Sequence, residues 1–226
     1  MEIPDTEVYL IRHAESEFNV RPQFVNGRSN DTELTWEGKT QARVLGEFLL
    51  ANDVMPDSVY TSPARRTRDT ATLCLKGMGL LAVPIADSRL QELDQGQWTG
   101  QPRDEVYTPK VTAQLKREGK DFKAPGGESM NEVAKRMRAW LETSFTDVST
   151  GVTERHFAFT HGVAIRCLVG SFRGWSQDKI YKTRTPNTSV TLLTRQNGLW
   201  RPDYVGFDPQ SGKPLPSGRR TAKSLL

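Results

Sequence analysis

The sequence predicts one α/β domain built of three layers, with a mostly parallel central sheet and helices on both of its faces. Short apolar runs of strand length alternate along the chain with longer stretches whose apolar residues recur at helical spacing. Two of the three histidines follow such runs directly. The length of 226 residues suits a single domain with a sizeable core. These observations favour an open sheet with functional groups at the edge where its strands end.

Five apolar runs predict the strands, at residues 8–11, 58–61, 83–86, 156–160 and 190–194. The first run leads into Arg12 and His13, and the fourth leads into His161. Because both runs end in the same way, we expect them to be neighbouring strands with both imidazoles at the carboxyl edge of the sheet. The remaining histidine, His156, stands at the start of its strand, and we interpret it as structural.

Amphipathic stretches between these runs predict the helices. Apolar residues recur at helical spacing over residues 39–51 and again over residues 130–141. Ser129 and Glu132 have the spacing of a capping box, which predicts the start of the second of these helices. A further helix is expected over residues 163–169, after the fourth strand.

Two segments depart from this alternation. Residues 101–124 combine mixed charge with weak periodicity, and we expect them to form an excursion from the sheet. After Asp208 the chain has four basic residues and no acidic one, so this tail accounts for the whole net charge of +4. Its proline, glycine and serine content predicts disorder. We therefore expect a domain over residues 1–208 and a basic, disordered tail over residues 209–226.

Composition and charge exclude several classes of function. The body of the chain is neutral and lacks the basic face interleaved with aromatics that nucleic-acid binding needs. No apolar run approaches the roughly 18 to 20 residues of a membrane helix, and the acidic start lacks the apolar core of a signal peptide, so we expect a cytoplasmic protein. Cys74 and Cys167 have no metal-ligand spacing and are expected to be free, buried thiols. We expect neither a metal nor another cofactor.

Five segments carry short motifs, in the order Arg12-His13-x-Glu15, Leu34-Thr35-x-x-Gly38-x-x-Gln41-Ala42, Thr61-Ser62-Pro63-x-x-Arg66-Thr67-x-x-Thr70-Ala71, Pro125-Gly126-Gly127-Glu128-Ser129 and Thr160-His161-Gly162. From about residue 8 to about residue 195, the chain is similar to the histidine phosphatase superfamily, also called phosphoglycerate-mutase-like. One Arg-His-x-Glu motif alone would be weak, because four common residues recur by chance, but five segments in the family's order are specific. The resemblance implies phosphoryl transfer without a metal.

His13 matches the histidine that, by this resemblance, accepts the phosphoryl group. A neutral imidazole can attack phosphorus in line and form phosphohistidine, provided that its other ring nitrogen holds the proton against a backbone carbonyl. An isolated histidine at a strand end is otherwise most simply a capped surface residue. Arg12 beside His13, and His161 across the predicted sheet, favour the catalytic interpretation.

Arg12 and Arg66 are the predicted phosphate clamps, because a guanidinium group meets two phosphoryl oxygens at once and stays charged. We interpret Ser62 as an N-cap and Pro63 as the first helical residue, which places Arg66 in the opening turn, near the positive end of a helix. Spacing alone leaves Arg65 as the alternative. The resemblance favours Arg66, because the family's arginine directly precedes a small residue.

Three more positions complete the predicted phosphate site. His161, at the end of its strand, is expected to donate a hydrogen bond to a phosphoryl oxygen. The N–H groups of the Gly162 turn and of the following helix add positive potential. Asn19 matches the family position that helps to hold the phosphate, although by chemistry alone it is equally suited to an Asx turn.

The general acid is chosen by resemblance, since the chain has 27 carboxylates. The run from Leu90 to Gly100 resembles the family's Leu-x-Glu followed by Gly-x-Trp-Glu-Gly, and Glu92 matches the proton donor. A carboxyl group near a phosphate dianion retains its proton because of like-charge repulsion, which suits a general acid. Asp94 is the alternative acid, and Glu15 is expected to orient its loop rather than to react.

Two residues depart from the family's pattern. Ala14 stands where glycine is common after the histidine, and Thr99 stands where the Trp-Glu-Gly stretch has glutamate. Neither change removes a catalytic group. The second change leaves the substrate open, because specificity is expected to lie in residues 101–124, which would cover the pocket.

Three functions compete. Water resolves the phosphohistidine in a phosphatase, whereas the bound product takes the phosphoryl group back in a cofactor-dependent phosphoglycerate mutase. A non-catalytic phosphate-binding or scaffold protein would do neither. Mutases follow their acid with an Arg-His-Tyr-Gly stretch, but residues 93–98 read Leu-Asp-Gln-Gly-Gln-Trp, which resembles the phosphatase branch. We therefore expect a metal-independent phosphomonoester hydrolase that acts on a small phosphorylated metabolite through phosphohistidine on His13.

Overall fold

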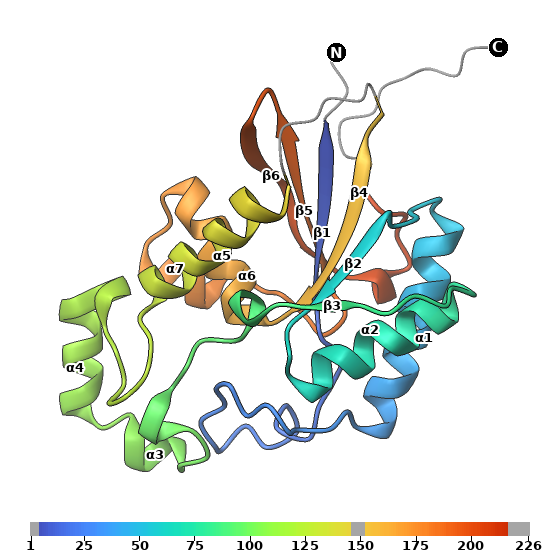
Figure 1. Ribbon diagram of the computed structural model, residues 1–226. Helices are drawn as coiled ribbons and strands as arrows, with labels where there is room; N and C mark the ends of the chain where they lie inside the picture. Colours follow the sequence, from blue (N-terminus) through green and yellow to red (C-terminus); the bar gives the residue numbers. More distant parts are fainter. Residues whose placement is uncertain (1–4, 146–151, 217–226) are drawn as a thin grey trace.

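The computed structural model describes residues 5–145 and 152–216. These residues form one central sheet with helices around it (Figure 1). Six strands of the described residues form this sheet: β1 (Thr6–Arg12), β2 (Ser58–Thr61), β3 (Ile85–Ala86), β4 (Glu154–Thr160), β5 (Val190–Gln196) and β6 (Leu199–Phe207). Their spatial order is β3-β2-β4-β1-β5-β6. The first four strands are mutually parallel, whereas β5 and β6 run antiparallel to their neighbours. The prediction of a mostly parallel sheet is confirmed.

The two strands that lead to His13 and His161 are neighbours, as predicted. β1 pairs in parallel with β4, and Arg12 at the end of β1 lies beside Thr160 at the end of β4. The N–H of His13 donates to the carbonyl of Thr160 at 2.9 Å, which extends the pairing by one residue. Both histidines therefore leave the sheet at the same edge.

β6 is a strand that the sequence analysis missed. It forms a hairpin with β5, and the turn consists of Asn197 and Gly198, both with positive φ (50° and 74°). Asn-Gly is the preferred dipeptide for such a two-residue turn, so this pair was the available signal. Pro202 obscured the strand, because proline is confined to sheet edges, and β6 is an edge strand.

Helices cover both faces of the sheet (Figure 1). The described residues contain α1 (Trp36–Ala51), α2 (Arg65–Gly77), α3 (Arg103–Val106), α4 (Pro109–Glu118), α5 (Met130–Ser144), α6 (Gly162–Arg173) and α7 (Gln177–Lys182). Tyr9 and Ile11 of β1 pack with α1 and α2 on one face. Val8 and Leu10 pack with α5 and α6 on the other face. Successive residues of β1 thus enter opposite layers, which confirms the three-layer arrangement.

One predicted helix start is confirmed and another is wrong. The capping box of α5 is present, because the Ser129 hydroxyl accepts from the N–H of Glu132 and the Glu132 carboxylate accepts from the N–H of Ser129. By contrast, α2 begins at Arg65 with Ala64 as its N-cap, and no side chain caps it. Ser62, three positions before the first helical residue, instead accepts from the Ala64 N–H at 3.3 Å.

Residues 101–124 contribute no strand to the sheet. They contain α3, α4 and a short 3₁₀ turn, and they project from the body in Figure 1. No residue of α4 is buried. An aromatic cluster connects this excursion to the loop before it, since the Trp98 ring lies 5.8 Å from that of Tyr107 and 5.5 Å from that of Phe122.

The start of the predicted tail is attached to the body, in contrast to the disorder expected from residue 209. Pro209–Ser211 forms a 3₁₀ turn in which Pro209 is buried. Leu215 packs beside the cluster under α1 and α2, and its N–H donates to the Asn52 side chain at 3.2 Å. These residues pack on the body through apolar side chains, which the proline, glycine and serine content of the tail did not reveal. The remaining tail, residues 217–226, lies outside the described residues.

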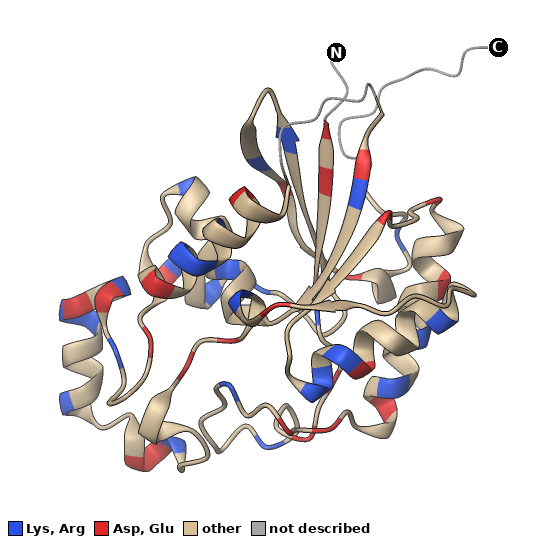
Figure 2. Cartoon of the chain, in the orientation of Figure 1, with Lys and Arg blue, Asp and Glu red and all other residues tan. Residues whose placement is uncertain are grey.

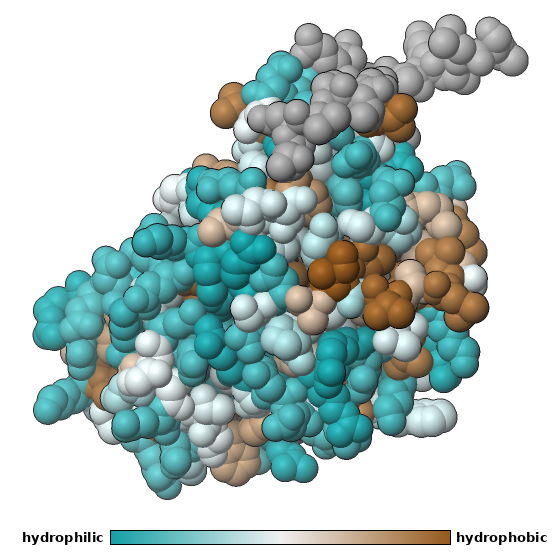
Figure 3. All heavy atoms as spheres, viewed as in Figure 1, coloured by the Kyte–Doolittle hydropathy of each residue, from teal (hydrophilic) through white to brown (hydrophobic). Residues whose placement is uncertain are grey.

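Figure 2 shows basic and acidic residues interspersed along the helices and loops. Figure 3 shows an apolar area beside the edge strand β3. Leu81, Val83 and Ile85, in and just before that strand, are exposed. Within residues 5–145 and 152–216, no helix combines the length and apolar character required to cross a membrane. Cys74 and Cys167 are free and buried, as predicted.

Candidate active site

The candidate site lies at the carboxyl ends of β1 and β4. His13 directly follows β1, and His161 follows β4 as the N-cap residue of α6. Both imidazoles are buried, and their ring centroids are 5.2 Å apart in an edge-on arrangement. Two histidines that are 148 positions apart in the sequence are thus brought into contact by one strand pair.

The tautomer of His13 follows from its hydrogen bonds. Its Nδ1 lies 2.8 Å from the carbonyl oxygen of Ala14, which can only accept, so Nδ1 carries the proton. Its Nε2 accepts from the Nε of Arg66 at 3.3 Å and is therefore unprotonated. Burial lowers the pKa of His13 well below 6.5, and the charges of Arg66 and Arg12 lower it further. His13 is thus a neutral imidazole with a lone pair on Nε2 at pH 7.

Arg66 is the arginine that enters the site. Besides its contact with His13, it donates to the carbonyls of Ser29 at 2.7 Å and Gly27 at 3.4 Å. Burial lowers its pKa to about 10, so the group is still charged at neutral pH. Arg65 points away: its side chain is 46% exposed and forms ion pairs on the surface. The choice of Arg66 over Arg65 as the residue beside His13 therefore agrees with the geometry.

Arg12 is half-buried and lines the cavity of the site. Its Nη1 donates to the carbonyl of Thr185 at 2.7 Å, whereas its Nε is buried without a hydrogen-bond partner among the described residues. Burial lowers the pKa of Arg12 to about 10, although the nearby charge of Glu92 opposes this effect. A buried N–H without an acceptor is costly, so Arg12 retains capacity to bind an anion.

His161 contacts the site through Arg66. The Nη2 of Arg66 lies 3.0 Å from His161 Nδ1, which must accept because a guanidinium only donates. The proton is consequently on Nε2, which donates to the Ser62 hydroxyl at 3.0 Å. This arrangement differs from the expected donation into the pocket, because that proton points toward Ser62. Burial, followed by the charge of Arg66, lowers the pKa of His161 well below 6.5.

Glu92 reaches the site from the loop after the 3₁₀ turn Ser88–Leu90. Its carboxylate accepts from the backbone N–H groups of Val163 at 3.1 Å and Ala164 at 2.9 Å, at the beginning of α6. A third N–H, that of Leu93, lies 2.9 Å away. The positive end of α6 therefore holds this side chain in place.

The other two candidate carboxylates are engaged elsewhere. Asp94 accepts from the N–H of Gly96 at 2.8 Å and pairs with Arg28 at 3.4 Å. Glu15 accepts from the Thr35 hydroxyl at 2.7 Å, as expected of a residue that orients its loop. Neither side chain is among the described residues that line the cavity.

These groups surround a cavity of about 280 Å³. Six predicted residues line it: Arg12, His13, Asn19, Arg66, Glu92 and Gly162. His161 lies behind Arg66 rather than on the wall. Asn19 is positioned by its side-chain oxygen, which accepts from both the N–H and the hydroxyl of Ser16 at 3.0 Å. A side chain at Gly162 would place its Cβ 3.3 Å from Arg12 Nε, so glycine leaves that wall open.

Seven lining residues were not among the predicted site residues: Ser16, Phe18, Asn26, Gly27, Ser29, Val163 and Arg166. Arg166 is the most important of them, since it adds a third guanidinium. It lies one helical turn after Gly162, so helical spacing was the available signal. Its Nη1 donates to the Thr185 hydroxyl at 2.6 Å. Its Nε, like that of Arg12, is buried without a partner among the described residues.

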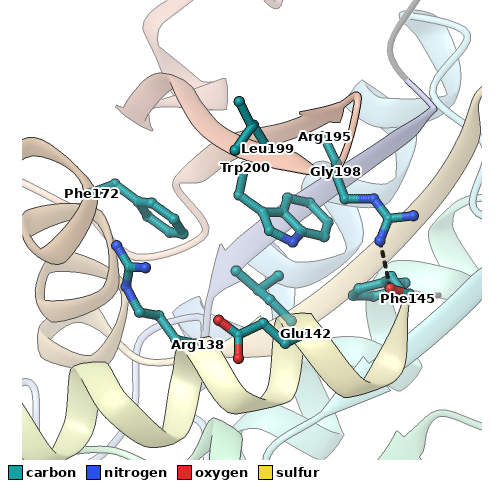
Figure 4. A pocket seen from close by; sticks show the side chains of 9 residues that line it. Arg138, Glu142, Phe145, Phe172, Arg195, Gly198, Leu199 and Trp200 are labelled. Carbon is teal, nitrogen blue, oxygen red and sulfur yellow. Dashed lines mark hydrogen bonds between the residues drawn. The ribbon is translucent and has the colours of Figure 1, made fainter. Parts of the chain in front are cut away.

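A larger cavity of about 570 Å³ lies between α5 and the β5–β6 hairpin (Figure 4). Its arginines already have partners. Arg138 donates to the Ser171 hydroxyl at 2.8 Å and stacks on Phe172, whereas Arg195 donates to the Phe145 carbonyl at 2.6 Å. No histidine is among the described residues that line it. We therefore assign the chemistry to the smaller cavity.

The smaller cavity is suited to an anion. Three guanidinium groups face one carboxylate, and backbone N–H groups of α6 add positive potential. Among residues 5–145 and 152–216, no group of three or more His, Cys, Asp or Glu side chains has the spacing to hold a metal ion. The positive charge on the cavity wall thus comes from arginine.

Comparison with known proteins identifies the family. The family model of the histidine phosphatase superfamily (branch 1) matches residues 8–207. A 2,3-bisphosphoglycerate-dependent phosphoglycerate mutase from Methylobacterium radiotolerans is 33% identical over 192 residues, which cover 83% of this chain and 88% of the relative.

Two solved structures are similar over nearly the same range. A mycobacterial glucosyl-3-phosphoglycerate phosphatase has a TM-score of 0.72 at 25% identity, with 89% of this chain and 99% of that chain covered. YhfR from Bacillus stearothermophilus has a TM-score of 0.75 at 29% identity, with 90% and 98% covered. The resemblance carried by the five motifs is therefore confirmed. The chain belongs to branch 1 of the histidine phosphatase superfamily.

Proposed function

We propose that this chain is a phosphomonoester hydrolase in which His13 carries the phosphoryl group as phosphohistidine. The observation that carries the proposal is the state of His13: its Nδ1 proton is held by a carbonyl, and its unprotonated Nε2 faces Arg66 in an anion-binding cavity. An imidazole in this state has the lone pair that attack on phosphorus requires.

In the first step, His13 Nε2 attacks phosphorus, and the bond from phosphorus to the leaving oxygen breaks. Glu92 transfers its proton to that oxygen, so the product leaves as an alcohol. Arg12 and Arg66 neutralise the charge on the phosphoryl oxygens. In the second step, water attacks the phosphohistidine, Glu92 takes a proton from the water, and inorganic phosphate leaves with His13 again neutral.

The substrate is proposed to be a small phosphorylated metabolite. The cavity of about 280 Å³ has room for a phosphoryl group and a compact leaving group. We further propose that residues 1–208 form the catalytic domain and that residues 101–124 cover the substrate. The aromatic cluster around Trp98 supports this role, because it ties the excursion to the loop that follows Glu92.

Phosphoglycerate mutase activity is the second candidate, because the Methylobacterium radiotolerans relative carries that name. Two observations favour hydrolysis. Residues 93–98 resemble the phosphatase branch, and the similar mycobacterial structure is named a phosphatase. A non-catalytic phosphate-binding role is disfavoured because the nucleophile, clamps and candidate acid all meet in one cavity. The proposed reaction uses no metal, and the proposed location is the cytoplasm.

A labelling experiment tests the proposal. A ³²P-labelled phosphomonoester should give a rapid, acid-labile and base-stable label on the wild-type protein, and His13→Ala should abolish both the label and phosphate release. A chelator should change neither rate. Added unlabelled phosphoglycerate separates the two candidates: a hydrolase releases the label as inorganic phosphate, whereas a mutase passes the label to the phosphoglycerate. Activity that persists in His13→Ala would refute the mechanism.

A further inference from the structure

In the motif Pro125-Gly126-Gly127-Glu128-Ser129, the serine caps α5, but the glutamate has no role in that cap. Glu128 does not line the cavity. We propose that Glu128 is a positioning residue, which holds the proton donor Glu92 in place through Arg28 and Arg136. This inference rests on the proposed function, because it assumes that Glu92 delivers the proton.

Glu128 joins two arginines from different parts of the fold. One carboxylate oxygen lies 2.8 Å from Arg28 Nη2 and 3.0 Å from Arg136 Nε, and the other lies 3.0 Å from Arg136 Nη2. The Glu128 side chain is 19% exposed. Burial acts to raise the pKa of Glu128, but the hydrogen bonds and charges of the two arginines outweigh burial and lower it below 4.5. The carboxylate is therefore charged at neutral pH.

Both arginines also reach the main chain of Glu92. Arg136 Nη2 donates to the Glu92 carbonyl at 3.0 Å, and Arg28 Nε donates to the same oxygen at 3.3 Å. Arg136 Nη1 fixes the preceding turn through the carbonyl of Arg89 at 2.6 Å. Two positive groups therefore share one backbone oxygen, and the carboxylate of Glu128 offsets the repulsion between them.

The backbone of the motif is docked on the segment that follows Glu92. The N–H of Glu128 donates to the Asp94 carbonyl at 2.9 Å, and the N–H of Asp94 lies 3.3 Å from the Glu128 carboxylate. A Cβ at Gly127 would lie 2.5 Å from the Asp94 carbonyl oxygen, and one at Gly96 would lie 2.2 Å from that of Pro125. Only glycine permits the two backbones to approach so closely, which explains Gly96 and Gly127. This approach leaves Glu128 beside the segment that follows Glu92.

This geometry matters for proton transfer, which requires a donor within about 2.6–3.2 Å of the leaving oxygen. The side chain of Glu92 is held by α6, whereas its backbone is held by Arg28 and Arg136. A shift of the backbone would pull the carboxyl group away from the N–H groups of α6 that hold it. A misplacement of about 1 Å at a reacting group can cost about 100-fold in rate. Loss of Glu128 should therefore impair protonation of the leaving group more than attack by His13.

The test is the Glu128→Gln variant of the full chain. Glutamine keeps the size but turns an N–H donor toward the two arginines. We expect kcat for glycerol phosphate, an alkoxide-leaving substrate, to fall about 10- to 100-fold. For p-nitrophenyl phosphate, whose leaving group needs little protonation, kcat should change by less than about threefold. The matched control is Glu132→Gln, on the exposed side of the same helix start, which should affect both substrates equally and weakly.

A double variant separates positioning from a general loss of structure. If Glu128 acts through Glu92, then adding Glu128→Gln to Glu92→Gln should lower glycerol phosphate turnover no further. Arg136→Lys should reproduce the selective loss, and it serves as the test if Glu128→Gln does not fold. Additive losses, or equal losses on both substrates, would overturn the positioning role.

The result also distinguishes this inference from the proposed function. If Glu92→Gln itself affects both substrates equally, Glu92 is not the proton donor. The proposed role of Glu92 and the positioning role of Glu128 then both fail. If Glu92→Gln shows the selective loss and Glu128→Gln does not, only the positioning role fails. The label on His13 is independent of either outcome.

Discussion

Arg66 is the residue at which the geometry and charge of the site converge. Carbonyls of Ser29 and Gly27 orient its guanidinium, and the same group donates to His13 Nε2 and His161 Nδ1. Because a guanidinium cannot accept a hydrogen bond, both imidazole nitrogens that face it are unprotonated. Arg66 thus keeps the proposed nucleophile neutral, and in the proposed reaction it also provides a charge for the phosphoryl group.

We expect Arg66→Lys to lower kcat/KM for p-nitrophenyl phosphate about 100-fold or more, comparable to removal of an oxyanion-hole donor. Lysine keeps the charge, but its single ammonium group cannot reproduce the planar fork that meets four acceptors. The matched control is Arg65→Lys, one position earlier and exposed, which should stay within about twofold. Steady-state kinetics on both folded variants provide the comparison. Similar losses in the two would contradict the assignment of Arg66.

Between elements, the site depends on where two strands end and one helix begins. β1 delivers Arg12 and His13, β4 delivers His161, and α6 begins at Gly162 with its N–H groups directed toward Glu92. α5 also contributes to this arrangement. Its opening turn follows the Pro-Gly-Gly-Glu-Ser motif, which contacts the segment after Glu92. The start of α5 therefore contributes both to the stability of this helix and to the site.

Ser129→Ala should lower the free energy of unfolding by about 1 kcal/mol, since it removes the side-chain half of the α5 capping box. Urea denaturation followed by circular dichroism measures this change. Lys135→Ala, at an exposed position in the same helix, should change stability by less than about 0.5 kcal/mol. An unaltered urea midpoint for Ser129→Ala would show that the cap does not stabilise the helix.

At the scale of the whole molecule, the three histidines couple folding to pH. Burial is the largest cause of the lowered pKa of His13, His156 and His161. In the unfolded chain these groups take up protons as the pH falls through about 6.5, whereas in the folded chain they do so only at lower pH. The unfolded state then binds more protons, so stability decreases as the pH falls.

We expect the free energy of unfolding to be constant above about pH 7 as far as the histidines are concerned, and to decrease between pH 6.5 and 4.5. Three protons set an upper slope of about 4 kcal/mol per pH unit. The lowered pKa values of Asp87, Glu128 and Glu132 act below this window. Urea titrations at a series of pH values measure the slope.

His156→Gln provides the control for this pH dependence. His156 is buried beside Ser58, outside the cavity, and contributes one of the three protons. Because the pKa of His156 is lowered by burial, the variant should show a smaller slope than the wild-type chain as the pH falls below about 6.5. Stability that does not change between pH 7 and 5 in the wild-type chain would contradict the lowered pKa values.

Much of the fold and several of its site residues follow from local sequence patterns. Apolar runs of strand length located β1, β2 and β4, and the sequence motifs selected His13, Arg66 and Glu92. The spacing of Ser129 and Glu132 located the start of α5. These features are local: the period of apolar residues, a cap, or a residue next to a strand end is readable within a few positions.

Other features depended on contacts between distant segments. The tautomer and direction of His161, the entry of Arg166 into the cavity and the amide contacts of Glu92 each involve partners far along the chain. The link from Glu128 to Glu92 through Arg28 and Arg136 is of the same kind. No short window of sequence contains both partners of such a contact.

The physical reason is that burial and charge act on neighbours in space. A side chain's pKa, its hydrogen-bond partners and the free space around it are set by every segment packed against it. Local pattern determined which side chains leave the sheet at the edge where β1 and β4 end. Packing of the loops and α6 against that edge decided which of them face the cavity, which hold a proton, and which support another residue from behind.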